Sequence, residues 1–216
     1  GALAAGAVTG TSFNGIPFFS ADTSSIYTTD VSGTDDTATG NSAYGYQAMD
    51  AITTGDNNTA VGYASLTANT TGAFNAAFGA FSLDINSTGS DNTALGASAL
   101  GANTTGNYNV AVGRAALSSN TTGTRNLAIG YAAYDGSDTE NDNIAIGYEA
   151  LTTNTAGGEN NVAIGNYTMD ALTSADANVA IGHYALGAVT TGGTNTAVGY
   201  EALATMTDAT RNTAVG

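Results

Sequence analysis

Few side chains in this sequence could carry out acid–base, nucleophilic or thiol chemistry. The chain has no Cys, and its only His is His183. Acid–base and nucleophilic mechanisms need a base held beside its target. Paired carboxylates could support glycoside hydrolysis, but the acidic residues here are scattered. We therefore predict no catalytic residues and no enzymatic activity, with His183 as a surface or interface residue.

Carboxylates do gather in the stretch from Asp135 to Asp142. Carboxylate and amide oxygens are the ligands that Ca²⁺ prefers. Asp135, Asp138 and Asp142 therefore form a candidate calcium site, with a solvated loop as the favoured alternative. We predict no other metal or cofactor.

Two further residue types could contact sugars. Asn-x-Ser/Thr is the acceptor pattern for N-linked glycans, although Asn-Thr-Thr-Gly is also good turn chemistry. The candidate glycosylation sites share one position of a repeat, and they are Asn69, Asn86, Asn103 and Asn120. The candidate glycan-contacting tyrosines, for which interface packing is the alternative, are Tyr63, Tyr131, Tyr148 and Tyr200.

These residues recur because the sequence is a repeat. The pattern Asn-x-Ala-φ-Gly, where φ is apolar, occurs eleven times, with starts 17 residues apart except for one step of 18. A fixed short period is the signature of a solenoid. The copies begin at Asn41, Asn58, Asn75, Asn92, Asn109, Asn126, Asn143, Asn161, Asn178, Asn195 and Asn212.

Each repeat, numbered from its Asn as position 1, is expected to form one coil of an all-β parallel solenoid. Ala is invariant at position 3 and Gly at position 5, as in Asn58-Ala60-Gly62, Asn143-Ala145-Gly147 and Asn178-Ala180-Gly182. We predict two short strands per coil, at positions 2–5 and 6–9, followed by a Thr/Asn/Gly-rich turn.

The pattern also predicts self-association. Side chains alternate between the faces of a strand, yet position 3 is always Ala and position 4 is always apolar. A strand constrained on both faces is buried twice, once in its own coil and once against another copy of the chain. A coil this small also has little apolar surface to offset its backbone entropy.

The charge of the chain limits the classes of partner that it is expected to bind. The chain has 18 acidic residues against three basic ones, for a net charge of −15. Nucleic-acid binding and attraction to anionic membranes need a basic surface, so neither is expected. No apolar run is long enough to span a membrane.

The copies Asn143-Ile-Ala-Ile-Gly147, Asn161-Val-Ala-Ile-Gly165 and Asn178-Val-Ala-Ile-Gly182 resemble the head repeats of trimeric autotransporter adhesins, the YadA-like group. The copy at Asn58 also resembles repeats of phage tail-fibre-like proteins. The resemblance implies a parallel β-roll, three chains side by side and a binding head. The adhesin repeat is shorter, and no stalk or membrane anchor is visible here.

The chain divides into two parts. Residues 1–40 are predicted to form an N-terminal cap or assembly segment, and residues 41–216 form the solenoid. The candidate assembly residues of the first part are apolar: Phe13, Ile16, Phe18 and Phe19. Because the chain stops within the eleventh copy, we also consider head-to-tail stacking, in which a neighbouring copy completes the open coil.

We therefore predict an extracellular structural fibre or adhesin-like protein, on a cell or virion surface, that assembles with itself as a homotrimer, a head-to-tail filament or both. The alternative is a phage tail-fibre segment that recognises surface glycans. A third interpretation, from the Thr-rich columns at positions 13 and 14, is an ice-binding solenoid.

Overall fold

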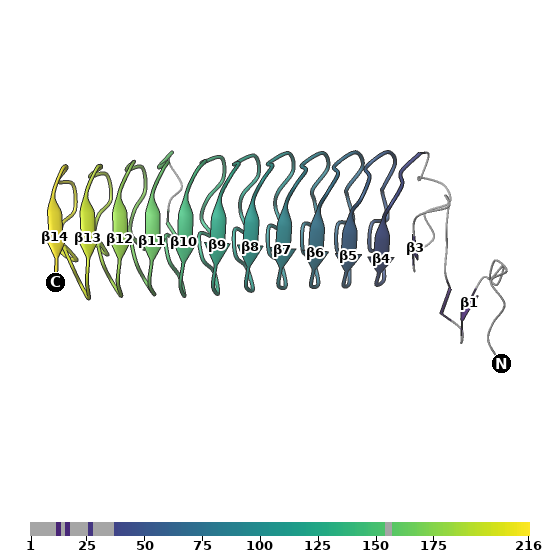
Figure 1. Cartoon of the computed structure of the whole chain (residues 1–216), viewed down its shortest axis with the longest axis horizontal. Helices are drawn as coiled ribbons and strands as arrows, with labels where there is room; N and C mark the ends of the chain where they lie inside the picture. Colours follow the sequence, from purple (N-terminus) through teal and green to yellow (C-terminus); the bar gives the residue numbers. More distant parts are fainter. Residues whose placement is uncertain (1–11, 14–15, 18–25, 28–36, 154–156) are drawn as a thin grey trace.

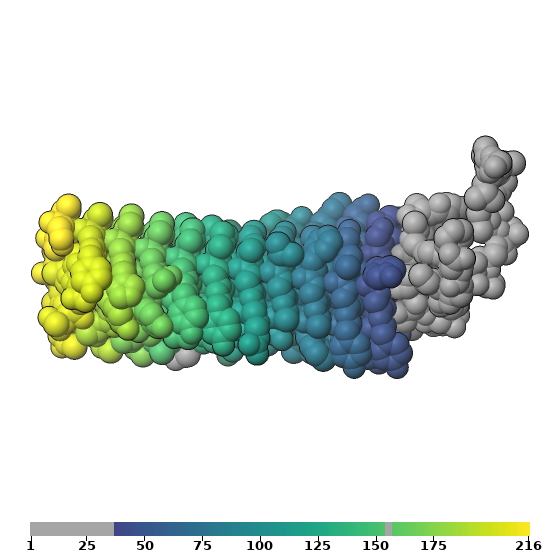
Figure 2. Space-filling model, turned by 90° about the horizontal axis from the view of Figure 1, so that it is seen from below, coloured from purple at the N-terminus to yellow at the C-terminus, as the bar shows by residue number. Residues whose placement is uncertain are grey.

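A computed structural model describes residues 12–13, 16–17, 26–27, 37–153 and 157–216. The repeats form a straight parallel β-solenoid, so the predicted fold class is confirmed (Figure 1). The coils stack into an elongated rod, as the space-filling view shows (Figure 2). Within the described residues, no helical segment is long and apolar enough to cross a lipid bilayer.

Each copy of the motif contributes one three-residue strand at positions 2–4. Consecutive strands pair in parallel without a shift, so that Ala60 lies beside Ala77 and every other position faces its own equivalent. The strands are β4 (Ser42–Tyr44), β5 (Thr59–Val61), β6 (Ala76–Phe78), β7 (Thr93–Leu95), β8 (Val110–Val112), β9 (Leu127–Ile129), β10 (Ile144–Ile146), β11 (Val162–Ile164), β12 (Val179–Ile181), β13 (Thr196–Val198) and β14 (Thr213–Val215).

The second predicted strand, at positions 6–9, does not form. Residues at positions 7 and 9 have left-handed backbones, as in Ala64 (φ 52°) and Leu66 (φ 53°), and so do those at position 17. A left-handed residue cannot continue a strand, so this segment is a turn. Such residues cost free energy unless the surrounding structure holds them in place, and here every coil contains three.

The core lies inside the coil, and three of its columns come from positions 3, 8 and 9. The invariant Ala at position 3 points inward from each strand, while the small residue at position 8 and the large one at position 9 both point inward from the turn. The strand expected at positions 6–9 would have sent positions 8 and 9 to opposite faces, whereas the turn sends both inward. The position 9 residues that are fully buried are Met49, Leu66, Leu83, Leu100, Leu117, Tyr134, Leu151, Met169 and Leu186.

Glycine at position 5 is required by two independent constraints. Its φ lies between +133° and +144° in every copy that another coil follows, a region that side-chain-bearing residues rarely enter. A Cβ atom on Gly113 would also lie 2.3 Å from the carbonyl oxygen of Gly130 in the next coil. The position therefore turns the chain out of the strand and lets neighbouring backbones touch.

The segment before the repeat contributes to the sheet. Strand β3 (Ile26–Tyr27) pairs in parallel with β4 and adds one strand to the solenoid. Strands β1 (Ser12–Phe13) and β2 (Ile16–Pro17) form a separate antiparallel pair that joins Phe13 to Ile16. Two of the candidate assembly residues, Phe18 and Phe19, lie outside the described residues.

The solenoid contacts begin slightly before the first motif. The amide of Thr37 donates to the carbonyl of Thr53, and that of Asn57 donates to the carbonyl of Thr39. Ala38 is fully buried in the core. Residues from Thr37 onward are therefore part of the first coil, a few positions before the expected boundary at residue 41.

Gly113→Ala tests the glycine constraint. We expect a loss of more than about 3 kcal/mol in unfolding free energy, because the substitution combines a forbidden φ with a backbone clash. Gly101→Ala is the matched control. Its φ is not left-handed and its nearest contact is 3.3 Å away, so a small effect is expected. Chemical denaturation measures both, and equal losses would contradict the explanation.

Candidate functional site

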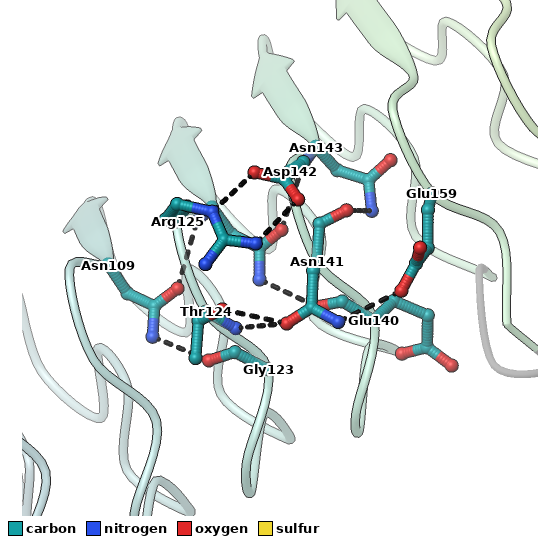
Figure 3. Close-up of polar contacts among 10 residues, drawn as sticks. Asn109, Gly123, Thr124, Arg125, Glu140, Asn141, Asp142, Asn143 and Glu159 are labelled. Atoms are coloured by element: carbon teal, nitrogen blue, oxygen red, sulfur yellow. Dashed lines mark hydrogen bonds and ion pairs between the residues drawn. The ribbon is translucent and has the colours of Figure 1, made fainter.

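A continuous column of buried Asn side chains joins the coils. From Asn58 to Asn212, the backbone amide of each position 1 Asn donates to the side-chain Oδ1 atom of the Asn one coil earlier, at 2.8–3.1 Å. Its Nδ2 group typically donates to a backbone carbonyl of its own coil, as Asn109 does to Gly123 at 2.7 Å (Figure 3). Each Asn thus supplies a donor and an acceptor that the surrounding backbone needs.

A second buried Asn column lies at position 12, where the candidate glycosylation sites are. All four side chains are fully buried. Their Nδ2 groups donate to the carbonyl of the Gly three residues later, as Asn103 does to Gly106 at 3.0 Å. Those of Asn86, Asn103 and Asn120 also donate to the Oδ1 atom of the previous Asn of the column. A glycan on a buried Nδ2 atom cannot coexist with these bonds. The glycosylation prediction for Asn69, Asn86, Asn103 and Asn120 is therefore wrong for this fold.

The sequence contained a signal for this burial. Position 12 carries an apolar residue in the coils on either side of the four Asn residues, namely Ile52, Leu172, Val189 and Met206. A column that accepts Ile and Leu is a core column. Asn is accepted there because it pairs with its copies above and below.

The position 12 column is interrupted in the coil that starts at Asn126. Ser137 replaces Asn, and two fully buried atoms, Asn120 Oδ1 and Ser137 Oγ, have no hydrogen-bond partner among the described residues. The same coil carries Tyr in place of Leu at position 9, and its hydroxyl accepts a bond from Asn143 Nδ2 at 2.6 Å. This coil immediately precedes the 18-residue repeat, where residues 154–156 lie outside the described residues.

The candidate calcium ligands contact different partners. Asp142 forms a bidentate pair with Arg125, with bonds of 2.6 and 2.8 Å (Figure 3). Arg125 holds the pKa of Asp142 below its ordinary value. Asp138 accepts a bond from the Thr121 hydroxyl. The described residues contain no group of three His, Cys, Asp or Glu side chains arranged to hold a metal.

Asp135 lies instead beside a second acidic group. Burial raises the pKa of its carboxyl, and repulsion from Glu149 raises it further. Burial likewise raises the pKa of Asp170, with a smaller contribution from Glu149. Asp135, Glu149 and Asp170 come from three successive coils, and none of them forms an ion pair among the described residues.

The outer face of the sheet is formed by positions 2 and 4 and is largely apolar, with Ser or Thr in five copies of position 2. Position 2 carries Ser42, Thr59, Ala76, Thr93, Val110, Leu127, Ile144, Val162, Val179, Thr196 and Thr213. Position 4 carries Tyr44, Val61, Phe78, Leu95, Val112, Ile129, Ile146, Ile164, Ile181, Val198 and Val215. In a single chain these residues are half-buried or exposed, for example Leu95 at 49% and Ile129 at 37%. We call this surface the sheet face.

Charge is excluded from the sheet face. None of its residues is charged, although the chain carries a net charge of −15. The charged residues of the described repeats lie instead in the turns and bends, for example Glu149 at position 7 and Asp170 at position 10. The sheet face is therefore a continuous surface on which two copies could meet without facing like charges.

Aromatic rings at positions 6 and 7 stack along one side of the sheet face. Tyr131 and Tyr148 stack at a centroid distance of 5.2 Å, and Tyr167 and Tyr184 at 5.0 Å. Tyr148 and Tyr167 meet edge to face at 5.4 Å. We call these four residues the tyrosine ladder. Beyond it, His183 stacks on Tyr200 at 5.5 Å, so His183 lies in an aromatic stack.

The ladder changes the interpretation of the candidate glycan-contacting tyrosines. Tyr131 and Tyr148 cover each other, Tyr63 is stacked on Tyr46 at 5.9 Å, and Tyr200 is stacked on His183. Each of the four is partly exposed, but at least one ring face of each lies against a neighbour. Stacking on a sugar needs a free ring face, and these contacts reduce the ring surface available for it; Tyr200, at 68% exposed, is the most open of the four.

The Thr columns lie in turns and not on the strand. At position 13 the hydroxyl donates to the carbonyl of the next coil, as Thr70 does to Ser87 and Thr104 does to Thr121, both at 3.0 Å. At position 14 the side chains are exposed at the tip of the turn, as for Thr105 and Thr122. The structure therefore assigns position 13 a role in joining the coils.

Comparisons with protein-family models, with curated protein sequences and with solved structures each return no match. The assignment of the chain to the β-solenoid fold therefore rests on its own structure. Its resemblance to adhesin head repeats stays a prediction from the motif.

Asn109→Ala tests the position 1 column. The substitution leaves the buried backbone amide of Asn126 without its partner and removes one of the two side-chain donors to the Gly123 carbonyl, which keeps Asn120. An unpaired buried group costs about 1–3 kcal/mol, so we expect a loss of about that size in chemical denaturation. Thr122→Ala, an exposed change in the same coil, should stay within about 0.5 kcal/mol. If the two variants are equally stable, the column has no structural importance.

Asp170→Asn tests the half-buried acidic groups. Because its pKa is raised in the folded chain, that state binds the proton more tightly than the unfolded chain. Lowering the pH from neutral through the raised pKa should therefore stabilise the wild type. The Asp170→Asn variant should have a higher thermal midpoint than the wild type at neutral pH, and it should gain less stability than the wild type on acidification. Asp208→Asn, at an exposed turn tip, is the control, and a matching change there would argue against burial as the cause.

Proposed function

We propose that this protein is a structural component of an extracellular, adhesin-like fibre, in which copies of the rod associate side by side through the sheet face. The observation that carries the proposal is that the sheet face is apolar, solvent-exposed in one chain and free of charge along the solenoid. Large exposed apolar patches on soluble proteins mark interaction sites. The adhesin resemblance favours three chains in the assembly.

A second copy of the chain is the partner that the surface fits. Every coil repeats the same spacing, so two rods have equal periods along their axes and can remain in register over their length. The negative charge lies on the other sides of the rod, where it opposes contact. Two copies can therefore approach closely through the sheet face and not through the acidic sides.

The size of the face is compatible with this role. Eleven strands at about 4.8 Å spacing give a length of about 50 Å, and three residues give a width of about 10 Å. The face would bury about 1,000 Å² in total, which is near the lower limit for a specific interface. The neighbouring aromatic side chains at position 6, including Tyr63 and Tyr131, would extend it.

Recognition of surface glycans is the second candidate function, and the stacked tyrosines favour it less because their ring faces are partly covered. The ice-binding interpretation is also less favoured, since the Thr columns lie in turns. For both alternatives, the sheet face has no assigned role. Self-association accounts for its apolar composition and for its lack of charge together.

Ile129→Asp, in the middle of the sheet face, tests the proposal. The chain should stay folded because this side chain is already partly in water. Burying an unpaired carboxylate in the interface costs about 3–5 kcal/mol, so the dissociation constant should rise by about 100-fold or more. Sedimentation equilibrium measures the association, and circular dichroism checks the fold.

Thr122→Asp is the matched control, since it adds the same charge at an exposed turn tip where Asp208 occurs naturally in another coil. It should leave the association unchanged. A wild-type protein that stays monomeric at all concentrations would overturn the proposal. So would an Ile129→Asp variant that assembles as tightly as the wild type.

A further inference from the structure

The tyrosine ladder brings phenol rings of four consecutive coils into contact. Tyr131 and Tyr148 lie nearly parallel, with an interplanar angle of 14°, and Tyr167 and Tyr184 with an angle of 10°. Tyr131, Tyr148 and Tyr184 are 42%, 40% and 37% exposed. Each stacked pair joins residues from adjacent coils, so a covalent bond within a pair would link one coil to the next.

The chain contains no Cys, so no disulfide can link one coil to the next. Among the described residues, the coils are joined by hydrogen bonds, by packed core side chains and by the ion pair of Arg125 with Asp142. The ladder also spans the 18-residue repeat and starts in the coil where the buried position 12 column is interrupted at Ser137. The stacked phenols thus begin in the coil after the run of position 12 Asn bonds, which ends at Asn120.

We propose that the tyrosine ladder is a site of oxidative modification, in which Tyr131 with Tyr148 and Tyr167 with Tyr184 form dityrosine cross-links between neighbouring coils. The reagent class is a one-electron oxidant acting on phenols, such as a peroxidase with hydrogen peroxide. This activity is independent of self-association through the sheet face.

The chemistry balances as follows for one pair. Each tyrosine loses one electron and its hydroxyl proton to give a phenoxyl radical, and the two radicals couple through ring carbons ortho to the oxygens. The two ortho hydrogens then move to the oxygens and restore both phenols. The net loss of two electrons and two protons reduces one hydrogen peroxide to two waters.

One neighbouring group assists the first step. The neighbouring carboxylate of Glu149 raises the pKa of the Tyr148 hydroxyl to about 12. This carboxylate can accept the phenol proton as the electron leaves. Ring contact then places the second tyrosine next to the radical.

Peroxidase oxidation of the folded, full-length protein at low concentration tests the inference. We expect dityrosine fluorescence, a mass loss of two hydrogens per link and, after digestion, peptides that join Tyr131 to Tyr148 and Tyr167 to Tyr184. The cross-linked chain should also unfold at a higher temperature than the untreated chain, because its coils can no longer separate.

Phenylalanine variants keep the ring stack and remove the reactive hydroxyl. Tyr131→Phe should lose the first link and keep the second, and Tyr184→Phe should do the reverse. Tyr108→Phe should keep both, since Tyr108 is exposed but contacts no ring among the described residues. Chain unfolded in denaturant should lose this pairing pattern.

The inference is overturned if the folded chain forms no dityrosine, or if the links involve Tyr108 as often as the ladder. Links that form only between chains would also overturn it. A wild-type protein that is monomeric yet gives the two expected links would leave the cross-linking site intact while contradicting the proposed assembly.

Discussion

The fold depends on the hydrogen bond between an Asn side chain and the backbone of the next coil. A single coil has one three-residue strand and three left-handed residues, so it is unfavourable by itself. Stacking changes this balance because each position 1 Asn bonds a backbone amide of the neighbouring coil, as Asn109 does for Asn126. Stability then comes from the contacts between coils, as in other solenoids. The parallel strands, the buried alanines and the close approach of the glycines all require this stacking.

The repeat period, the strand at positions 2–4 and the parallel arrangement could be predicted from the sequence, because they follow from a fixed spacing and an alternating pattern. The turn at positions 6–9 could not. Its left-handed residues include Leu66 and Leu83, and residue type gives no indication that a leucine adopts this conformation. The error reversed the expected direction of position 8, since two neighbouring residues on a turn can both point inward.

The candidate functional sites could likewise be predicted only in part from the sequence. Asn69 and its equivalents match the acceptor pattern for glycans and are also good turn chemistry, whereas Ile52 and Leu172 at the same position indicate a core column. The calcium prediction relied on residues close in sequence, but the coil sends Asp135 and Asp142 to different partners. The apolar character of position 4 was visible in the sequence. Its position beside a charge-free position 2, on one continuous surface, follows from the strand geometry.

The left-handed turns and the axial hydrogen bonds together have a mechanical consequence. Tension applied to the two ends of the chain would peel coils from the rod one at a time, since each coil is held mainly by its neighbours. Once detached, a coil cannot keep its strained turns, and it would release 17 residues of slack. Extended, these span about 50 Å beyond the coil's own rise of about 4.8 Å. The rod would thus yield in equal steps and act as an extensible tether.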